Sequence, residues 1–343
     1  MNLKKRLNSL VELGKQLTPA NERLQIVVRE TALNNGWFTE DNQWQAIAEI
    51  RKHFLSKSTL ETWVNGYISD ENHETTPKTV ALVLAGNIPL VGFHDILCVY
   101  VAGHKSLIKT SDKDPYLVPF IVKSLEIIDP QSKPYFTFTE GALKGFDAVI
   151  ATGSNNSARY FEAYFGKYPN IIRKNRNAVA ILRGGEKRSD LIRLGKDIFT
   201  YFGLGCRNVS KLYVPRGYDF DPLLRALHTF KDIVMHDKYK NNFDYQFALV
   251  ILNKVAYKSN GCSMMIENEG IASPIAMVYY EYYDDFTTLS SKIQEKKDEI
   301  QCIVSNSVIE GLPCFNFGDA QKPSISDYAD GVDVMRFLTV SLP

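Results

Sequence analysis

Cys206 has the setting best suited to covalent chemistry. It lies in the run Phe202-Gly-Leu-Gly-Cys206-Arg-Asn-Val, where two glycines open the backbone around the sulfur and a cation follows directly. A nearby cation and local backbone N–H groups lower the pKa of a thiol and favour the nucleophilic thiolate. The alternative is a buried structural cysteine, the usual role of a lone cysteine. Cys98 fits that role inside an apolar run, whereas Cys262, in a polar loop, is the main competitor for reactivity.

Asn87 is a candidate for stabilising an oxyanion. It follows a predicted strand in the turn Leu84-Ala-Gly86-Asn87-Ile-Pro89. A side-chain amide N–H can donate a hydrogen bond to the negative oxygen that develops during acyl transfer. The alternative is a turn asparagine that bonds to its own local backbone.

Two strand ends have residues suited to a nucleotide. The first is the run Ser106-Leu-Ile-Lys109-Thr-Ser-Asp112, in which Lys109 stands at the carboxyl end of a predicted strand. Its ammonium group can donate hydrogen bonds to ribose hydroxyls or to a phosphate. In the run from Gly153 and Ser154 a strand leads directly into a helix, whose free N–H groups can hold a phosphate. The alternatives are a solvated strand end and an ordinary capped turn.

The elements that must position these residues follow from hydrophobic patterning. Residues 1–75 show helical spacing, interrupted by Gly14; beyond them we expect strands at 79–84, 106–108 and 147–151 and helices at 92–102, 116–128 and 157–165. This alternation predicts a parallel sheet in an open α/β domain.

A second α/β region follows. We expect a strand at 178–182, a helix at 188–202 and strands at 211–214 and 303–304, with 220–230, 247–252, 276–283 and 287–297 continuing the alternation. The predicted organisation is an N-terminal helical segment (1–75), a nucleotide-binding α/β domain (76–177), a catalytic α/β domain (178–319) and a loop-like C-terminal tail (320–343).

Composition narrows the class of protein. The 343 residues are 45% hydrophobic and 23% charged, which is ordinary for a globular chain. A formal charge of +1 gives no electrostatic reason to expect nucleic acid. We find no stretch long and apolar enough to span a bilayer and no signal peptide, so we expect a cytoplasmic protein. Five cysteines without a CxxC pair argue against a disulfide framework and a metal site.

The order and spacing of Asn87, Lys109, Gly153-Ser154 and Cys206 resemble the aldehyde dehydrogenase superfamily. Several segments from about residue 80 onward are similar to the LuxC-type acyl-CoA reductases, which make fatty aldehyde. The resemblance implies an aldehyde dehydrogenase-like fold of two open α/β domains. It is carried by the segments AGNIPLVGFHD, ATGSNNSARYFEAYFGKYPNIIRKNR, FGLGCRNVSKLYVP, ASPIAMVYYEYYD and SDYADGVDVMRFL.

The resemblance also implies roles for individual residues. Cys206 matches the nucleophile, and Asn87 matches the side chain that forms the oxyanion hole with the Cys206 backbone N–H. The cofactor positions are matched by Lys109, Ser111 and Asp112 at the adenosine ribose, by Gly153 and Ser154 at the phosphates, and by Glu269 at the nicotinamide ribose. Glu269 is offset by one residue from that match, and Ala158 stands where the superfamily usually has a glycine.

One departure bears on the reaction type. Hydrolytic aldehyde dehydrogenases have a general-base glutamate in Glu-Leu-Gly-Gly about thirty residues before the cysteine. The segment at 182–185 has no glutamate there, and by spacing the matching segment, 172–175, is basic. Without that base, water is poorly activated to attack an acyl-cysteine. The alternatives are a non-acylating aldehyde dehydrogenase and an inactive nucleotide-binding subunit.

The cofactor and partners follow from the same resemblance. Lys113 and the LuxC-like segments favour NADPH, whereas Asp112 favours NADH because a carboxylate repels a 2′-phosphate. Coenzyme A is the expected leaving group, and Arg173, Lys174 and Arg176 either meet its phosphates or form a solvated face. The resemblance also implies a homo-oligomer with acyl-transferase and synthetase partners.

Overall fold

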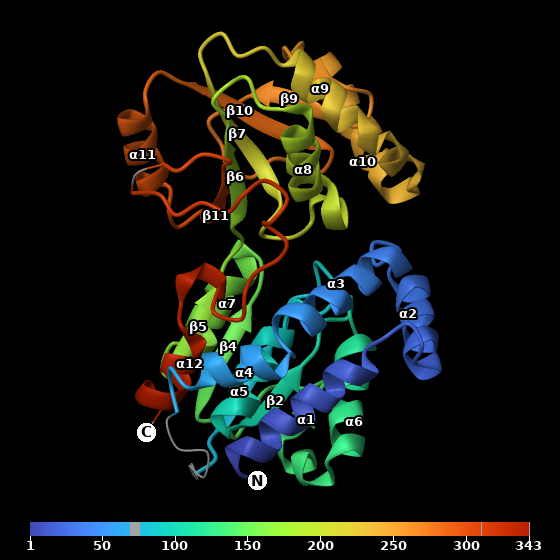
Figure 1. The fold of residues 1–343 in the computed structure, drawn as a ribbon, viewed down its shortest axis with the longest axis vertical. Coiled ribbons are helices and arrows are strands. Elements are labelled where there is room, and N and C mark those ends of the chain that lie inside the picture. Colours follow the sequence, from blue (N-terminus) through green and yellow to red (C-terminus); the bar gives the residue numbers. More distant parts are fainter. Residues whose placement is uncertain (69–75, 310, 343) are drawn as a thin grey trace. The chain divides into compact units, whose positions relative to one another are not determined.

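The computed structural model describes residues 1–68, 76–309 and 311–342. The chain forms two compact units (Figure 1). Unit 1 comprises Met1–Asn175 and Pro323–Pro343, and unit 2 comprises Arg176–Lys322. The predicted boundary at residue 75 lies outside the described residues, and the division into four segments stays a prediction.

A five-stranded parallel sheet forms the centre of unit 1. Its strand order is β3-β2-β1-β4-β5, and every neighbouring pair is parallel. The strands are β1 (Thr79–Val83), β2 (Lys105–Lys109), β3 (Phe136–Phe138), β4 (Ala148–Thr152) and β5 (Asn170–Arg173). The short edge strands β3 and β5 have no counterpart among the strands predicted from the sequence.

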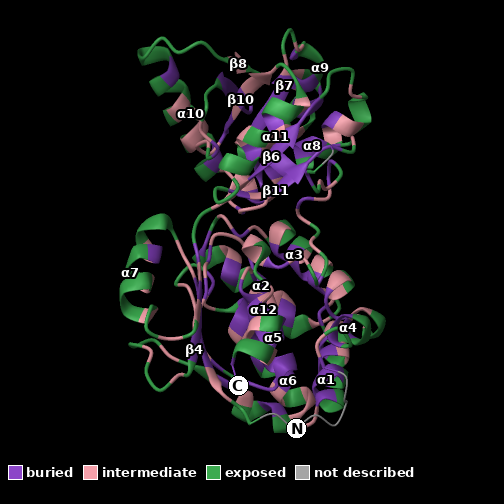
Figure 2. Cartoon of the chain, turned by 90° about the vertical axis from the view of Figure 1, so that its left-hand side faces the viewer, coloured by how far each residue is buried: buried purple, intermediate pink, exposed green. Residues whose placement is uncertain are grey.

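Helices cover both faces of this sheet. On one face, α5 (Phe93–Ala102) buries every side chain except His94, and it packs with α1 (Leu3–Gln16) and α6 (Leu117–Ile128). On the other face, α7 (Asn155–Phe165) contacts β4 and β5. Only Ala158 of α7 is buried, and most of this helix is exposed (Figure 2).

The N-terminal segment is helical, as predicted. It continues through α2 (Glu22–Asn34), α3 (Glu40–His53) and α4 (Lys57–Val64). Gly14 does not interrupt α1. A Cβ atom there would lie 2.9 Å from Cβ of Leu55, so glycine allows this close approach.

The C-terminal segment is not simply loop-like. It holds the short helical turns η4 (Ala329–Gly331), α12 (Val334–Arg336) and η5 (Phe337–Ser341) and contributes Val334, Met335 and Leu338 to the core of unit 1. Trp63 Nε1 donates to the Tyr328 hydroxyl at 2.9 Å. These apolar and polar contacts attach the segment to α4 and α5.

Unit 2 is built on a six-stranded sheet of order β11-β6-β7-β10-β9-β8. All pairs are parallel except β8–β9. The strands are β6 (Asn177–Ile181), β7 (Val209–Pro215), β8 (Lys258–Ser259), β9 (Met264–Glu267), β10 (Met277–Tyr283) and β11 (Ile300–Val304).

The helices of unit 2 pack on both faces of its sheet. The core on one face includes α8 (Arg188–Phe199) and α9 (Asp221–Leu227), and α11 (Phe286–Glu295) lies on the other. The run at 247–252 is the last part of α10 (Asp237–Leu252), which begins ten residues earlier. Three short turns complete the helical elements: η1 (Pro130–Tyr135) in unit 1, and η2 (Thr200–Gly203) and η3 (His228–Met235) in unit 2.

Candidate functional site

The predicted nucleotide residues of unit 1 gather at one edge of its sheet. Because the strands are parallel, their carboxyl ends meet at the same edge. The strand order reverses between β1 and β4, which are neighbours, and open α/β sheets bind ligands at such a point. Asn87 follows β1, Lys109 ends β2, and Gly153 and Ser154 follow β4.

The loops after β1 and β2 are packed together at this edge. A Cβ atom on Gly86 would lie 2.4 Å from the Ser111 hydroxyl oxygen, so glycine is required for this approach. The Asp114 carboxylate accepts a hydrogen bond from the Leu90 backbone N–H at 2.9 Å. Burial raises the pKa of Asp114 to about 6. These contacts hold the segment that carries Asn87 beside Ser111 and Asp112.

The loop after β4 forms a capped helix start. The Ser154 hydroxyl accepts a hydrogen bond from the Ser157 backbone N–H at 3.1 Å, and Ser154 itself is exposed. Ala158, in the first turn of α7, is fully buried, so its side chain packs inside the protein beneath the start of the helix. Lys109 is half-buried and donates to the Gly141 carbonyl at 3.4 Å. A cation, hydroxyls and a helix N-terminus therefore share one edge.

Arg173 has neither of the two roles expected for it. Its guanidinium makes two hydrogen bonds to the Asp95 carboxylate, at 2.6 and 3.0 Å, and both residues are 6% exposed. The pKa of Arg173 is raised: burial lowers it, but the Asp95 carboxylate outweighs that effect. Arg173 is therefore held in a buried ion pair between β5 and α5, while its neighbour Lys174 pairs with Glu162 at the surface.

Cys206 lies in unit 2 in a turn just before β7 and is half-buried. Asn208, 1% exposed, fixes this turn. Its side-chain oxygen accepts from the Gly205 N–H at 2.7 Å, and its amide donates to the backbone carbonyls of Asp197 at 3.0 Å and Thr200 at 2.8 Å. The turn is thus attached to the end of α8.

The backbone of the three residues 201–203, shortly before Cys206, has an unusual conformation. Tyr201 and Phe202 have φ angles of 54° and 58°, and Gly203 follows at 78°. The left-handed region costs a non-glycine residue of order 1–3 kcal/mol, and such strain persists only where surrounding contacts enforce it. The bonds of Asn208 to the neighbouring backbone are contacts of this kind.

The other cysteines are less suited to act as nucleophiles. Cys262, the main competitor, is fully buried, and burial raises the pKa of its thiol to about 11. Burial also raises the thiol pKa of Cys98 and of Cys314. Cys302 is buried in β11. Cys206 alone among the five combines partial exposure with a position in a turn between glycine and the start of a strand.

Glu269 is exposed in the loop after β9. The neighbouring carbonyl of Asn268 accepts from Lys211, a β7 residue that is fully buried, and Ser210 Oγ donates to the Ile271 carbonyl at 2.7 Å. Burial lowers the pKa of Lys211. The loop of Glu269 is therefore bonded to the strand that begins three residues after Cys206.

Neither of the two segments compared with the Glu-Leu-Gly-Gly motif supplies a general-base glutamate. Leu182–Gly185 follows β6 at the carboxyl edge of the sheet, whereas Cys206 precedes β7 at the opposite edge. The segment at 172–175 ends β5 and contains the ion-paired Arg173. Among the described residues, Glu186 is the nearest glutamate to 182–185 along the chain, and its carboxylate accepts the N–H groups of Arg183 and Gly184.

Solved structures share the fold of these two α/β units. Aldehyde dehydrogenase 21 from Physcomitrella patens matches with a TM-score of 0.71 at 13% identity, over 100% of this chain and 85% of that one. Aldehyde dehydrogenase C from Pseudomonas syringae, solved with NAD+ and octanal, matches with a TM-score of 0.64 at 12% identity, over 89% of this chain and 72% of that one. The chain has the aldehyde dehydrogenase fold. The predicted fold class is confirmed.

The sequence itself is similar to a reductase. A long-chain acyl-protein thioester reductase from Photobacterium leiognathi is 26% identical over 195 residues, and the match covers 52% of this chain and 40% of that protein. The LuxC-type resemblance is confirmed by this match. No protein-family model matches the chain. In the part of the chain that the structure describes, no helix has the length and apolar character needed to cross a membrane.

The aldehyde dehydrogenase fold brings some predicted residues together and leaves others in different units. Asn87, Lys109, Ser111, Asp112, Gly153 and Ser154 share the carboxyl edge of unit 1, whereas Cys206 and Glu269 belong to unit 2. The pairing of Asn87 with Cys206 stays a prediction. The residues predicted from the sequence do not include Asn208, Asp114 and Arg173 as positioning residues. For Asn208 a signal existed, since it lies two residues after the candidate nucleophile.

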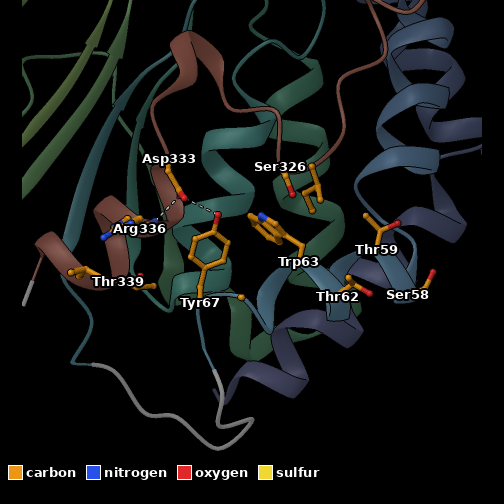
Figure 3. A pocket seen from close by; sticks show the side chains of 12 residues that line it. Ser58, Thr59, Thr62, Trp63, Tyr67, Ser326, Asp333, Arg336 and Thr339 are labelled. Carbon is orange, nitrogen blue, oxygen red and sulfur yellow. Dashed lines mark hydrogen bonds between the residues drawn. The ribbon is translucent and has the colours of Figure 1, made fainter. Parts of the chain in front are cut away.

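A groove of about 850 Å³, lined by both polar and apolar residues, lies in unit 1 between α4 and the C-terminal segment (Figure 3). Trp63 and Tyr67 line one side, and Asp333 and Arg336 line the other. Tyr67 donates to the Asp333 carboxylate at 2.8 Å. None of the predicted site residues lines this groove, so it is separate from the candidate site.

Proposed function

We propose that this chain reduces an acyl thioester, either a fatty acyl-CoA or a carrier-bound fatty acyl group, to the aldehyde. The observation that carries the proposal is the half-buried Cys206 in a glycine-flanked turn that Asn208 fixes. The resemblance to a long-chain acyl-protein thioester reductase supports the substrate class.

In the proposed reaction the Cys206 thiolate attacks the thioester carbonyl carbon and forms a carbon–sulfur bond. The carbonyl electron pair moves to oxygen, where the Asn87 amide and the Cys206 backbone N–H donate hydrogen bonds. One such donor is worth about 3 kcal/mol in the transition state. When the oxyanion collapses, the bond to the original sulfur breaks, and coenzyme A or the carrier leaves as a thiolate that takes up a proton. The acyl group remains on Cys206.

The residues at the carboxyl edge of unit 1 fit a nicotinamide dinucleotide. In the proposal, Lys109, Ser111 and Asp112 bind the adenosine ribose, Gly153 and Ser154 bind the phosphates, and Glu269 of unit 2 binds the nicotinamide ribose. When bound in its reduced form, the cofactor supplies hydride. Lys113 beside the exposed Asp112 favours NADPH over NADH through its positive charge.

The absence of a glutamate at 172–175 and at 182–185 favours reduction over hydrolysis. A water molecule without a general base attacks the acyl-cysteine slowly, so the acyl group survives long enough to be reduced. The competing functions are oxidation of aldehyde to acid and a catalytically inactive nucleotide-binding role. Cytoplasmic location and acyl-transferase and synthetase partners belong to the same proposal, through the resemblance.

The test is intact-mass spectrometry after the protein is mixed with a long-chain acyl-CoA and no reduced cofactor. We expect one acyl adduct, mapped to Cys206 by peptide analysis, with release of one equivalent of coenzyme A. Cys206→Ala should form no adduct, and Cys262→Ala, the matched control, should form it normally. Addition of NADPH should then release aldehyde.

Three results would contradict the proposal. An adduct that survives in Cys206→Ala would place the nucleophile elsewhere. Release of free acid rather than aldehyde when NADPH is added would favour a hydrolytic enzyme, and no adduct from acyl-CoA or acyl-carrier protein would favour the inactive role.

A further inference from the structure

Asp197, near the end of α8, is a buried carboxylate that the proposed reaction does not use. It is 1% exposed. Its two oxygens accept hydrogen bonds from two different backbone groups, the Gly318 N–H at 2.6 Å and the Ala320 N–H at 3.1 Å. The nearby cation Lys322 pairs with Asp319 instead, at 3.0 Å. A buried carboxylate is costly unless it is hydrogen-bonded, so these two N–H groups account for its presence.

The segment that Asp197 holds, residues 315–320, contacts the residue that follows Cys206. The Arg207 guanidinium lies over the Phe315 ring, 5.2 Å from its centroid. The Phe315 backbone N–H donates to the Ile303 carbonyl at 2.9 Å, which attaches the segment to β11. The segment therefore connects β11, the end of α8 and the turn of Cys206.

Asp197 also anchors the Cys206 turn, through its backbone. Its carbonyl oxygen accepts a hydrogen bond from the Asn208 side-chain amide at 3.0 Å, and the Asn208 side-chain oxygen accepts the Gly205 N–H. Asp197 thus bonds to the turn through its main chain and to residues 315–320 through its side chain. Because both attachments meet at one residue, the position of the segment relative to the turn depends on Asp197.

The side-chain bonds require a carboxylate. A carboxylate only accepts hydrogen bonds, so its two oxygens can each take one N–H. A protonated carboxyl or an amide turns a donor toward one of the two N–H groups, and that bond is lost. The segment has little room to adjust, since Gly318 has a φ angle of 89° and a Cβ atom there would lie 3.0 Å from Cβ of Arg193.

We propose that Asp197 is a positioning residue for Cys206: its carboxylate holds residues 315–320 against the end of α8 and so fixes how the Cys206 turn presents the sulfur to the thioester. The inference rests on the proposed function, because it takes Cys206 as the nucleophile. Loss of one bond to the carboxylate leaves Cys206 chemically intact but less well placed, and attack on a carbonyl carbon slows when the reacting atoms are misplaced.

The proposal predicts a pH dependence that is separate from the ionisation of the thiol. Burial raises the pKa of Asp197 to about 7, although the bonds from Gly318 and Ala320 act to lower it. Asp319 raises this pKa further and Lys322 lowers it. The other charged groups on the elements packed against Asp197 are Asp190, Arg193 and Lys196 on α8 and Arg207 in the turn. Above that pH the carboxylate makes both bonds, and below it one bond is lost.

Hydrogen–deuterium exchange of the full chain measures how firmly the segment is held, and it needs no variant. Exchange of peptides covering 315–320, corrected for the intrinsic effect of pH, should slow several-fold between about pH 5.5 and about pH 8.5 in the unaltered chain. Asp197→Asn keeps the shape of the side chain and mimics the protonated carboxyl, so it should exchange at the faster rate at both pH values. Asp190→Asn, the matched control on the same helix, should behave as the unaltered chain does.

The rate at which a long-chain acyl-CoA forms the acyl adduct on Cys206, without cofactor, measures the consequence for the reaction. We expect Asp197→Asn to be several-fold slower than the unaltered chain at about pH 8.5 and equal to it at about pH 5.5. Asp190→Asn should match the unaltered chain at both pH values. Alkylation of Cys206 by iodoacetamide, measured in parallel, should likewise differ several-fold between Asp197→Asn and the unaltered chain only at the higher pH.

The pH profile separates positioning from a merely structural role. The proposal is overturned if Asp197→Asn slows acylation by the same factor at both pH values, if it leaves the rate unchanged at both, or if the exchange of 315–320 does not depend on pH. If the unaltered chain forms no adduct on Cys206, the proposed function is contradicted instead, and the exchange and alkylation measurements still decide whether Asp197 positions the turn.

Discussion

Replacing Arg173 by methionine is expected to destabilise unit 1 strongly. The substitution removes the cation of the buried pair with Asp95 and leaves a carboxylate that is 6% exposed. Methionine approximates the aliphatic part of arginine, so the change is mainly one of charge. Breaking a buried, hydrogen-bonded pair in this way costs about 3–5 kcal/mol, because the remaining charge has lost its compensation.

The pair itself contributes less than this loss suggests. The two hydrogen bonds of 2.6 and 3.0 Å offset the cost of taking both charges out of water. Arg173→Met combined with Asp95→Asn removes both charges, so we expect a cost of only about 1–2 kcal/mol relative to the unaltered chain. The coupling between the two positions is therefore expected to exceed about 2 kcal/mol.

The assay uses the tryptophans of the chain. Trp37, Trp44 and Trp63 are its three tryptophans, and all lie in unit 1. Their fluorescence during urea denaturation therefore reports the unfolding of unit 1 without a contribution from unit 2. Lys174→Met is the matched control. This substitution breaks the adjacent ion pair between Lys174 and Glu162, in which each side chain is 52% exposed. It should change the free energy of unfolding by less than about 1 kcal/mol.

The reasoning is refuted if Arg173→Met costs no more than Lys174→Met, since the pair would then not be buried in solution. It is also refuted if the double variant is as unstable as the sum of the two single variants. That result would mean that Arg173 and Asp95 act independently.

Three further predictions concern the candidate site. Asn208→Ala removes the hydrogen bond from the Gly205 N–H. We therefore expect a several-fold change in the rate at which iodoacetamide alkylates Cys206, and a decrease of about 1–3 kcal/mol in the free energy of unfolding of unit 2. An unchanged alkylation rate would argue against a fixed turn. Burial raises the pKa of Asp197 to about 7, so the folded state holds this proton more tightly than the unfolded state. Unit 2 should lose stability as the pH rises through that value, and urea titrations of Asp197→Asn should show a flatter dependence. Gly86→Ala should weaken NADPH binding several-fold in fluorescence titrations, because its Cβ would lie 2.4 Å from the Ser111 hydroxyl oxygen and displace a residue of the proposed ribose site; an unchanged affinity would contradict this reasoning.

The strands that place the candidate site could be predicted from the sequence. The runs that form β1 and β4 consist mostly of β-branched or small residues and are largely buried, so their local composition alone predicts strands. Turn residues at their carboxyl ends mark the predicted nucleotide edge. The resemblance added the role of each residue, which patterning could not supply.

Other features depend on partners far away along the chain. The charge of Arg173 is typical of an exposed residue, and only the distant Asp95 makes it a buried one. The apolar run at 247–252 has the composition of a buried strand, but the charged and polar residues before it continue the same helix. The Tyr328 hydroxyl accepts a hydrogen bond from the indole N–H of Trp63, which is 265 residues away along the chain, so no local sequence pattern indicates this contact.

The return of residues 323–342 to unit 1 makes unit 2 an insertion within it. During synthesis on the ribosome, α5 emerges long before Tyr328, the partner against which His94 stacks. Unit 1 can therefore complete its core only after all of unit 2 has been translated. Unit 2, a continuous segment, has every strand of its own sheet available by then and can fold first.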